Sequence, residues 1–237
     1  DEFFDKAIEG AVMFALNQGE VCTCPSRMLV QESIYEKFME RVVERTNAIK
    51  LGHPLDPETM MGAQASNDQY EKILNYINIG KEEGCKVLAG GKAAYNEGLE
   101  GGFYIQPTIL EGHNKMRVFQ EEIFGPVTAF IKAKDTTDAL RIANSVEYGL
   151  TGAYFSQDPA KIDRALREFN VGNLYINRKC TGALVGAQPF GGFNMSGTDA
   201  KAGGRDYLLY FLQPKSMTVR PSEGVSYDVH EFNYAKK

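Results

Sequence analysis

The chain has 237 residues, of which 43% are hydrophobic and 24% are charged, a balance typical of a globular protein with one or two domains. The net charge is −5 and no basic run occurs, which argues against a nucleic-acid partner. No apolar run has the length of a membrane span, and four unevenly spaced cysteines favour a reducing, cytoplasmic compartment over a disulfide-stapled secreted fold.

Hydrophobic periodicity predicts the elements of the first half of the chain. Residues 1–16 carry apolar side chains at helical spacing, and residues 27–31 form a short apolar run that favours a buried strand. Ser33, with Glu36 three residues later, is typical of a capping box at the start of the next helix. The pattern then predicts a helix over 66–83, a strand over 86–89 and an extended segment over 104–110.

Strand and helix patterns alternate in the second half. The expected elements are a strand at 127–133, an Asp135-capped helix to 146, a strand at 151–156, a helix from Asp158 and Pro159 to 169, and a strand at 172–177. This order predicts an α/β fold with a largely parallel sheet, helices on both faces and right-handed crossovers. A short helix at 207–212 and a last strand at 216–219 complete one expected domain over 1–220, and the polar tail over 221–237 is unassigned.

Two thiols, Cys22 and Cys24, lie in a short loop that contains Gly19 and ends at Pro25. A reactive cysteine must be accessible to its substrate, and a loop can provide this access. Most free cysteines, however, are small buried hydrophobes. Cys-x-Cys lacks the second ligand pair of a zinc site and the three histidines are scattered, so no metal site is expected. The two thiols are also too close in sequence for an unstrained disulfide.

The string from 17 to 22, Asn-Gln-Gly-Glu-Val-Cys, resembles the cysteine signature of the aldehyde dehydrogenase superfamily. The resemblance implies that Cys22 is the catalytic nucleophile and that Cys24 is a neighbour. The family more often has glutamine at the position of Glu20. A carboxylate there opposes thiolate formation unless it points away from Cys22.

A second string, Glu-Glu-Ile-Phe-Gly-Pro at 121–126, is similar to the superfamily's Glu-Glu-x-Phe-Gly-Pro motif. Without the resemblance to this motif, the expected reading is that the two glutamates are solvated and that the phenylalanine lies in the core. The resemblance implies that Glu122 accepts hydrogen bonds from the nicotinamide ribose and that Phe124 packs against the nicotinamide. The implied cofactor is NAD, and NADP stays open because nothing in this sequence matches the residues that read the ribose 2′ position.

The third motif begins with Cys-Thr-Gly-Ala-Leu-Val-Gly at 180–186. Glycine-rich turns are usually structural, but their N–H groups can bind anions, which favours a carboxylate-bearing substrate. Together with Ser-Gly-Thr-Asp-Ala-Lys-Ala-Gly-Gly at 196–204, the string resembles the pyrroline-5-carboxylate dehydrogenase branch, which oxidises glutamate semialdehyde. The resemblance implies that Gly182, Ala183 and the Thr23 hydroxyl anchor the substrate carboxylate and that Phe190 lines the aldehyde channel.

The implied function is the catalytic half of an NAD(P)-dependent aldehyde dehydrogenase that acts through a Cys22 thioester, with a homo-oligomeric parent. Glutamate γ-semialdehyde is the first substrate candidate. Residues 1–84 are more similar to the acetaldehyde and lactaldehyde branch, so a simple aliphatic aldehyde is the alternative. The family's dinucleotide-binding domain, general-base glutamate and oxyanion asparagine have no match in this sequence. Only traces of activity are therefore expected from this chain alone.

Three further hypotheses stay open at this point. A thiol esterase needs only Cys22 and an oxyanion hole. A non-enzymatic fragment could associate through its last strand, because exposed strand edges pair readily with other chains. An acylating dehydrogenase with a CoA acceptor would use the same cysteine.

Overall fold

The computed structural model describes residues 2–95, 98–198 and 200–220, so the expected tail at 221–237 lies outside the described residues. Its helices and strands, in chain order, are α1 (Glu2–Val12), β1 (Arg27–Gln31), α2 (Tyr35–Asn47), α3 (Asn67–Glu82), β2 (Lys86–Ala89), β3 (Thr108–Glu111), β4 (Val127–Ala133), α4 (Thr136–Ala143), β5 (Tyr148–Gly149), β6 (Thr151–Tyr154), α5 (Pro159–Glu168), β7 (Asn173–Ile176) and β8 (Phe193–Asn194). Short 3-10 turns lie at Leu16–Gly19, Glu32–Ile34, Arg117–Phe119 and Arg205–Phe211.

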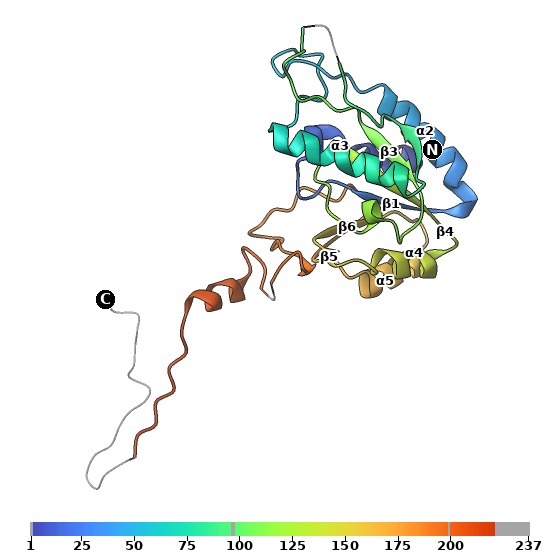
Figure 1. Ribbon diagram of the computed structural model, residues 1–237. Helices are drawn as coiled ribbons and strands as arrows, with labels where there is room; N and C mark the ends of the chain where they lie inside the picture. The colour runs from blue at the N-terminus through green and yellow to red at the C-terminus, as the bar shows by residue number, and fades with distance from the viewer. Residues whose placement is uncertain (1, 96–97, 199, 221–237) are drawn as a thin grey trace.

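The main sheet has four strands in the order β1-β4-β3-β2. β4 pairs in parallel with both β1 and β3, and β2 is antiparallel to β3. A separate parallel ladder joins β6 to β7, and β5 pairs with β8. The α/β prediction with a largely parallel sheet is therefore confirmed (Figure 1).

Side chains of the central strand β4 alternate between two hydrophobic cores. Phe130 packs with Val12 of α1 and Val42 of α2, whereas Ala129 and Ile131 lie in a second cluster with residues of α3. Successive strand residues point to opposite faces of a sheet, so this division means that helices cover both faces, as the sequence predicts.

The helix caps test the predicted boundaries. Ser66 Oγ accepts the Gln69 N–H at 3.2 Å, and an Asp135 carboxylate oxygen accepts the Asp138 N–H at 2.9 Å, so the predicted starts of α3 and α4 are confirmed. The capping box at Ser33 is wrong. A 3-10 turn over Glu32–Ile34 precedes α2, and the Ser33 hydroxyl accepts a hydrogen bond from the Gln31 side chain instead.

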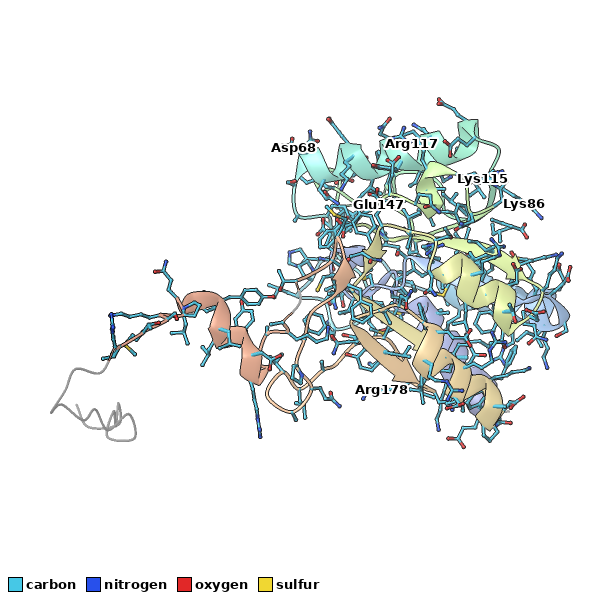
Figure 2. The ribbon with its side chains drawn as sticks, turned by 90° about the horizontal axis from the view of Figure 1, so that it is seen from below. Asp68, Lys86, Lys115, Arg117, Glu147 and Arg178 are labelled. Atoms are coloured by element: carbon cyan, nitrogen blue, oxygen red, sulfur yellow. The ribbon has the colours of Figure 1, made fainter. Side chains whose placement is uncertain are left out.

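The last described segment extends away from the body of the molecule in both views (Figures 1 and 2). Its helical part, Arg205–Phe211, is 3-10, and Leu208 and Phe211 are 67% and 70% exposed. Residues 216–219 form no strand within the described chain. Their expected pairing with another subunit stays a prediction. Among the described helices, none is long and apolar enough to cross a membrane.

Candidate active site

The cysteine loop has an unusual backbone immediately before Cys22. Asn17, Gln18 and Gly19 have φ angles of 56°, 58° and 70°, in the left-handed region that side-chain-bearing residues rarely adopt. Gly19 also touches the turn before β4, because a Cβ at Gly19 would lie 2.0 Å from the carbonyl carbon of Gly125. Glycine is therefore required at this position, and the contact holds the cysteine loop against the 121–126 motif.

Cys22 lies in a tight turn that leaves its reactive groups accessible. The Cys24 N–H donates to the Val21 carbonyl at 3.0 Å, so Cys22 and Thr23 are the central residues of a β-turn. The Cys22 thiol is exposed. Within the described part of the chain, neither its Sγ nor its backbone N–H has a hydrogen-bond partner. This arrangement suits a nucleophile whose own N–H stabilises an oxyanion.

The neighbouring thiols have a different environment. Burial raises the pKa of Cys24 to about 11 and also raises the pKa of Cys180. The Cys180 thiol donates to the Thr23 carbonyl at 3.3 Å. Both thiols are therefore protonated at neutral pH, and Cys22 is the thiol best placed to react. In the described ranges, no group of three His, Cys, Asp or Glu side chains could hold a metal ion.

Glu20 does not face the Cys22 thiol. Both of its carboxylate oxygens accept the backbone N–H of Ala65 at 3.1 Å. This bond ties the cysteine loop to the segment that precedes α3. The Glu20 carboxylate is therefore engaged by the Ala65 backbone.

Cys22 shares a cavity of about 470 Å³ with Glu122 and Phe124. The cysteine loop contributes Gly19, Val21 and Cys22 to its lining, and the turn before β4 contributes the two motif residues. The fold thus brings together two motifs that lie about a hundred residues apart in the chain.

Phe124 is held in a strained conformation. Its φ is 58°, rare for an aromatic residue, and the residue is 36% exposed. Gln69, in the first turn of α3, donates to the carbonyls of Ile123 at 3.3 Å and Phe124 at 2.5 Å, which fixes this backbone. Residues in such conformations cluster at functional sites.

The two acidic residues of the motif differ in environment. Glu121 accepts hydrogen bonds from Arg117 at 2.7 Å and from the Tyr76 hydroxyl at 2.8 Å, and the Arg117 guanidinium lowers the pKa of this carboxyl group. Arg117 lies on the α3 side of the molecule (Figure 2). Glu122 is exposed and has no hydrogen-bond or ion-pair partner in the described ranges. Glu121 is therefore structural, and Glu122 is free to bind a ligand.

The glycine-rich loop reaches the cysteine loop through two hydroxyl groups. Thr23 Oγ1 donates to Thr181 Oγ1 at 2.9 Å, and the Arg178 guanidinium donates to the Thr181 carbonyl at 3.0 Å. Gly182 follows with a φ of 88°. The N–H groups of Gly182 and Ala183 have no acceptor among the residues that the structure describes.

Not every expected residue lies in the cavity with Cys22. The four residues expected to bind the substrate, Thr23, Gly182, Ala183 and Phe190, are absent from its lining. Phe190 forms two backbone hydrogen bonds with Ala202, each of 2.9 Å. Sequence reasoning also missed Thr181 and Gln69. The hydroxyl before Gly182 was a usable signal for Thr181. No local pattern could indicate Gln69, which acts on a turn more than fifty residues later.

Known proteins are similar in sequence to this chain over nearly its whole length. The aldehyde dehydrogenase family model matches residues 2–217. An acetaldehyde dehydrogenase 2 from Cupriavidus necator is 50% identical over 220 residues, which are 92% of this chain and 43% of the relative. A 1-pyrroline-5-carboxylate dehydrogenase from Geobacillus is 51% identical over 201 residues, 84% of this chain and 38% of the relative.

A solved structure extends the comparison to the fold. The crystal structure of 1-pyrroline-5-carboxylate dehydrogenase from Thermus with bound NAD matches with a TM-score of 0.81 at 45% identity, covering 89% of this chain and 40% of that one. The chain spans less than half the length of these relatives. Because the family model matches almost the whole chain, and relatives of about half-identical sequence agree with it, the chain belongs to the aldehyde dehydrogenase family.

Proposed function

We propose that this chain is the catalytic half of an NAD(P)-dependent aldehyde dehydrogenase, which oxidises an aldehyde to a carboxylic acid through a thioester on Cys22. The single observation that carries the proposal is the cavity that the exposed Cys22 thiol shares with Glu122 and Phe124. The parent protein would be cytoplasmic and homo-oligomeric. The exposed apolar C-terminal segment of this chain supports the oligomer.

The residues of the cavity suit a nicotinamide nucleotide. The unpaired Glu122 carboxylate can accept hydrogen bonds from a ribose diol, and the exposed Phe124 ring offers an apolar face to a nicotinamide. NAD is the cofactor that we propose, because the Thermus relative was solved with it. Both groups would act in the same way on NADP.

The chemistry follows from the Cys22 turn. The thiolate adds to the aldehyde carbon, and the Cys22 N–H stabilises the oxyanion that forms. A bound nicotinamide cofactor supplies the hydride acceptor. The carbon is then held as a thioester on Cys22, and water cleaves this bond to release the acid and regenerate the thiol. A base to activate that water would come from outside this chain.

The substrate that we propose is glutamate γ-semialdehyde. Thr23 donates its hydroxyl proton to Thr181, which leaves the Thr181 proton available for an acceptor. Together with the unengaged N–H groups of Gly182 and Ala183, these hydroxyls suit the carboxylate of an amino-acid aldehyde. Phe190 would line the path of the aldehyde. A simple aliphatic aldehyde is the second candidate, because the acetaldehyde dehydrogenase is as similar to this chain as the pyrroline-5-carboxylate dehydrogenase.

A chimera tests the proposal. Residues 2–217 would replace the matching segment of the Geobacillus enzyme, and NADH formation would be followed with glutamate γ-semialdehyde and with acetaldehyde. We expect turnover that is lost in Cys22→Ala and kept in the matched control Cys24→Ala. We also expect kcat/KM to be higher for the semialdehyde.

Two results would count against the proposal. A folded chimera with intact Cys22 that forms no NADH with either aldehyde contradicts the dehydrogenase assignment. A higher kcat/KM for acetaldehyde supports the second substrate candidate instead.

A further inference from the structure

Arg178 follows β7 and contacts the loop that contains Gly182. Its guanidinium donates to the Thr181 carbonyl at 3.0 Å, and a Cβ at Gly182 would lie 3.2 Å from the same guanidinium nitrogen. Arg178 is exposed, and no carboxylate within the described ranges forms an ion pair with it. Its polar contact in this part of the chain is therefore with the backbone of the loop.

The end of β7 determines where Arg178 lies. The Asn177 N–H donates to the Tyr154 carbonyl at 2.9 Å, and the Asn177 side-chain amide forms two hydrogen bonds of 2.9 Å with the backbone of Ser156. Arg178 follows beside the β6–β7 ladder (Figure 2). Its guanidinium lies over the ring of the buried Tyr175, 5.1 Å from the ring centroid. This cation-π contact holds the guanidinium in place.

The bond from Arg178 determines the direction of the next N–H group. In a trans peptide, the C=O group and the following N–H group lie in one plane and point in opposite directions. Because Arg178 holds the Thr181 carbonyl, the Gly182 N–H points away from the guanidinium. Gly182 has a φ of 88°, and a glycine by itself lets a peptide plane rotate, since it tolerates both signs of φ.

Thr23 holds the loop at two further points, from the side of the cysteine turn. Its hydroxyl donates to the Thr181 hydroxyl at 2.9 Å, and its carbonyl accepts the Cys180 thiol at 3.3 Å. The N–H groups of Gly182 and Ala183, which follow these contacts, have no acceptor in the part of the chain that the structure describes. Successive unengaged N–H groups on a fixed backbone are suited to binding an anion.

We propose that Arg178 is a positioning residue for the substrate, which fixes the Thr181–Gly182 peptide so that the Gly182 N–H stays directed at the substrate carboxylate. The inference rests on the proposed function, which assigns that carboxylate to this loop. Arg178 acts through the backbone and makes no contact with the ligand itself. A donor that is already oriented binds an anion more tightly, because less conformational freedom is lost on binding.

Glutarate tests the proposal, because it carries carboxylates but no aldehyde and its binding needs no reaction at Cys22. The full chain would be titrated with glutarate, and with the neutral glutaramide, at constant ionic strength, while NMR follows the Gly182 and Ala183 amides. We expect Arg178→Ala to raise the dissociation constant for glutarate about tenfold. The order parameter of the ligand-free Gly182 amide should fall from about 0.85 to below about 0.6. Glutaramide should bind equally weakly to both proteins.

Arg205→Ala is the matched control, because it removes an exposed arginine for which no hydrogen bond or ion pair is found in the described ranges. It should change the glutarate dissociation constant less than about twofold and leave the order parameter of Gly182 as it is. Arg178→Gln is the second variant if Arg178→Ala does not fold. The shorter glutamine side chain loses the contact over Tyr175, and we expect the same two effects.

Three results would overturn the proposal. In the first, glutarate shifts neither amide of the unmodified chain. In the second, the Arg178 variants bind glutarate as tightly as the unmodified chain or no more weakly than Arg205→Ala. In the third, binding weakens while the order parameter of Gly182 is unchanged, which means that the guanidinium acts on the ligand through its charge. NADH formation by the chimera with acetaldehyde reports on the dehydrogenase separately, so either proposal can fail while the other holds.

Discussion

At the scale of single residues, the shape of the site depends on Gly19. This residue combines a φ of 70° with a backbone contact that leaves no room for a Cβ. Gly84 is a matched control, because its φ is 93° but nothing lies within 4 Å of the position that a Cβ would take there. We expect Gly19→Ala to lower the free energy of unfolding by more than about 4 kcal/mol, and Gly84→Ala by about 1–2 kcal/mol.

Urea denaturation of the two variants provides the measurement. Similar losses in both would contradict the close contact between the cysteine loop and Gly125. Loss of cooperative unfolding in Gly19→Ala alone would agree with it.

Cys24 links stability to pH. Its pKa in the folded chain is about 11, against 9.0 for an ordinary thiol, because burial disfavours the thiolate. Below pH 9 the Cys24 thiol is protonated in both the folded and the unfolded chain, so ionisation of Cys24 takes nothing from the free energy of unfolding. Between pH 9 and 11 the unfolded chain ionises first, so the free energy of unfolding falls as the pH rises.

Cys24→Ala should therefore make the decline in the free energy of unfolding between pH 9 and 10 shallower than in the unmodified chain. Urea titrations at pH 7, 9 and 10 would measure it. An identical slope in both proteins would contradict a buried, protonated Cys24.

The residues proposed to contact the substrate or cofactor could be predicted from sequence, because they lie in short motifs that can be recognised. Cys22, Glu122 and Phe124 belong to short strings that resemble family motifs, and the structure places them on one cavity. Their supporting contacts could not be named. Gln69 fixes Phe124 and Ala65 holds Glu20 across long stretches of chain, and such pairs follow from tertiary packing alone.

At the scale of elements, capping chemistry separates the correct boundaries from the wrong one. Ser66 caps α3 through the Gln69 N–H, whereas Ser33 caps nothing and only accepts a bond from Gln31. We expect Ser66→Ala to cost about 1 kcal/mol of stability and Ser33→Ala less than about 0.5 kcal/mol. Equal costs in thermal or urea unfolding would contradict the observed start of α2.

The elements with strong periodicity were predictable because local sequence determines them. β4 spans 127–133 as expected, and α5 begins at Pro159 after an Asp158 cap. The separation of β6 and β7 from the main sheet was not predictable, because strand order depends on long-range pairing. Periodicity identifies a strand but says nothing about which edge is left open.

At the scale of the whole molecule, the C-terminal segment over residues 205–220 is the surface best suited to bind another chain. Its apolar side chains are largely exposed, among them Leu208, Leu209, Phe211, Met217 and Val219. Contiguous exposed apolar residues mark interaction surfaces. We expect the full chain to self-associate and a chain that ends at Gly204 to be monomeric in sedimentation velocity experiments.

A full-length variant with Leu208→Gln and Phe211→Gln is the matched control, because it keeps the segment but removes much of its apolar surface. It should associate more weakly than the unmodified chain. A monomeric full chain, or a truncated chain that still associates, would contradict this role of the segment.

The central claim is that Cys22 is the accessible thiol of a cavity that serves one reaction. Its most direct test is the rate of alkylation of each cysteine in the folded chain by iodoacetamide at pH 8, with the modified sites identified by mass spectrometry. We expect Cys22 to react first, and Cys24, Cys85 and Cys180 only on unfolding. Earlier modification of Cys24 or Cys180, or a Cys22 that resists the reagent until the chain unfolds, would contradict the account.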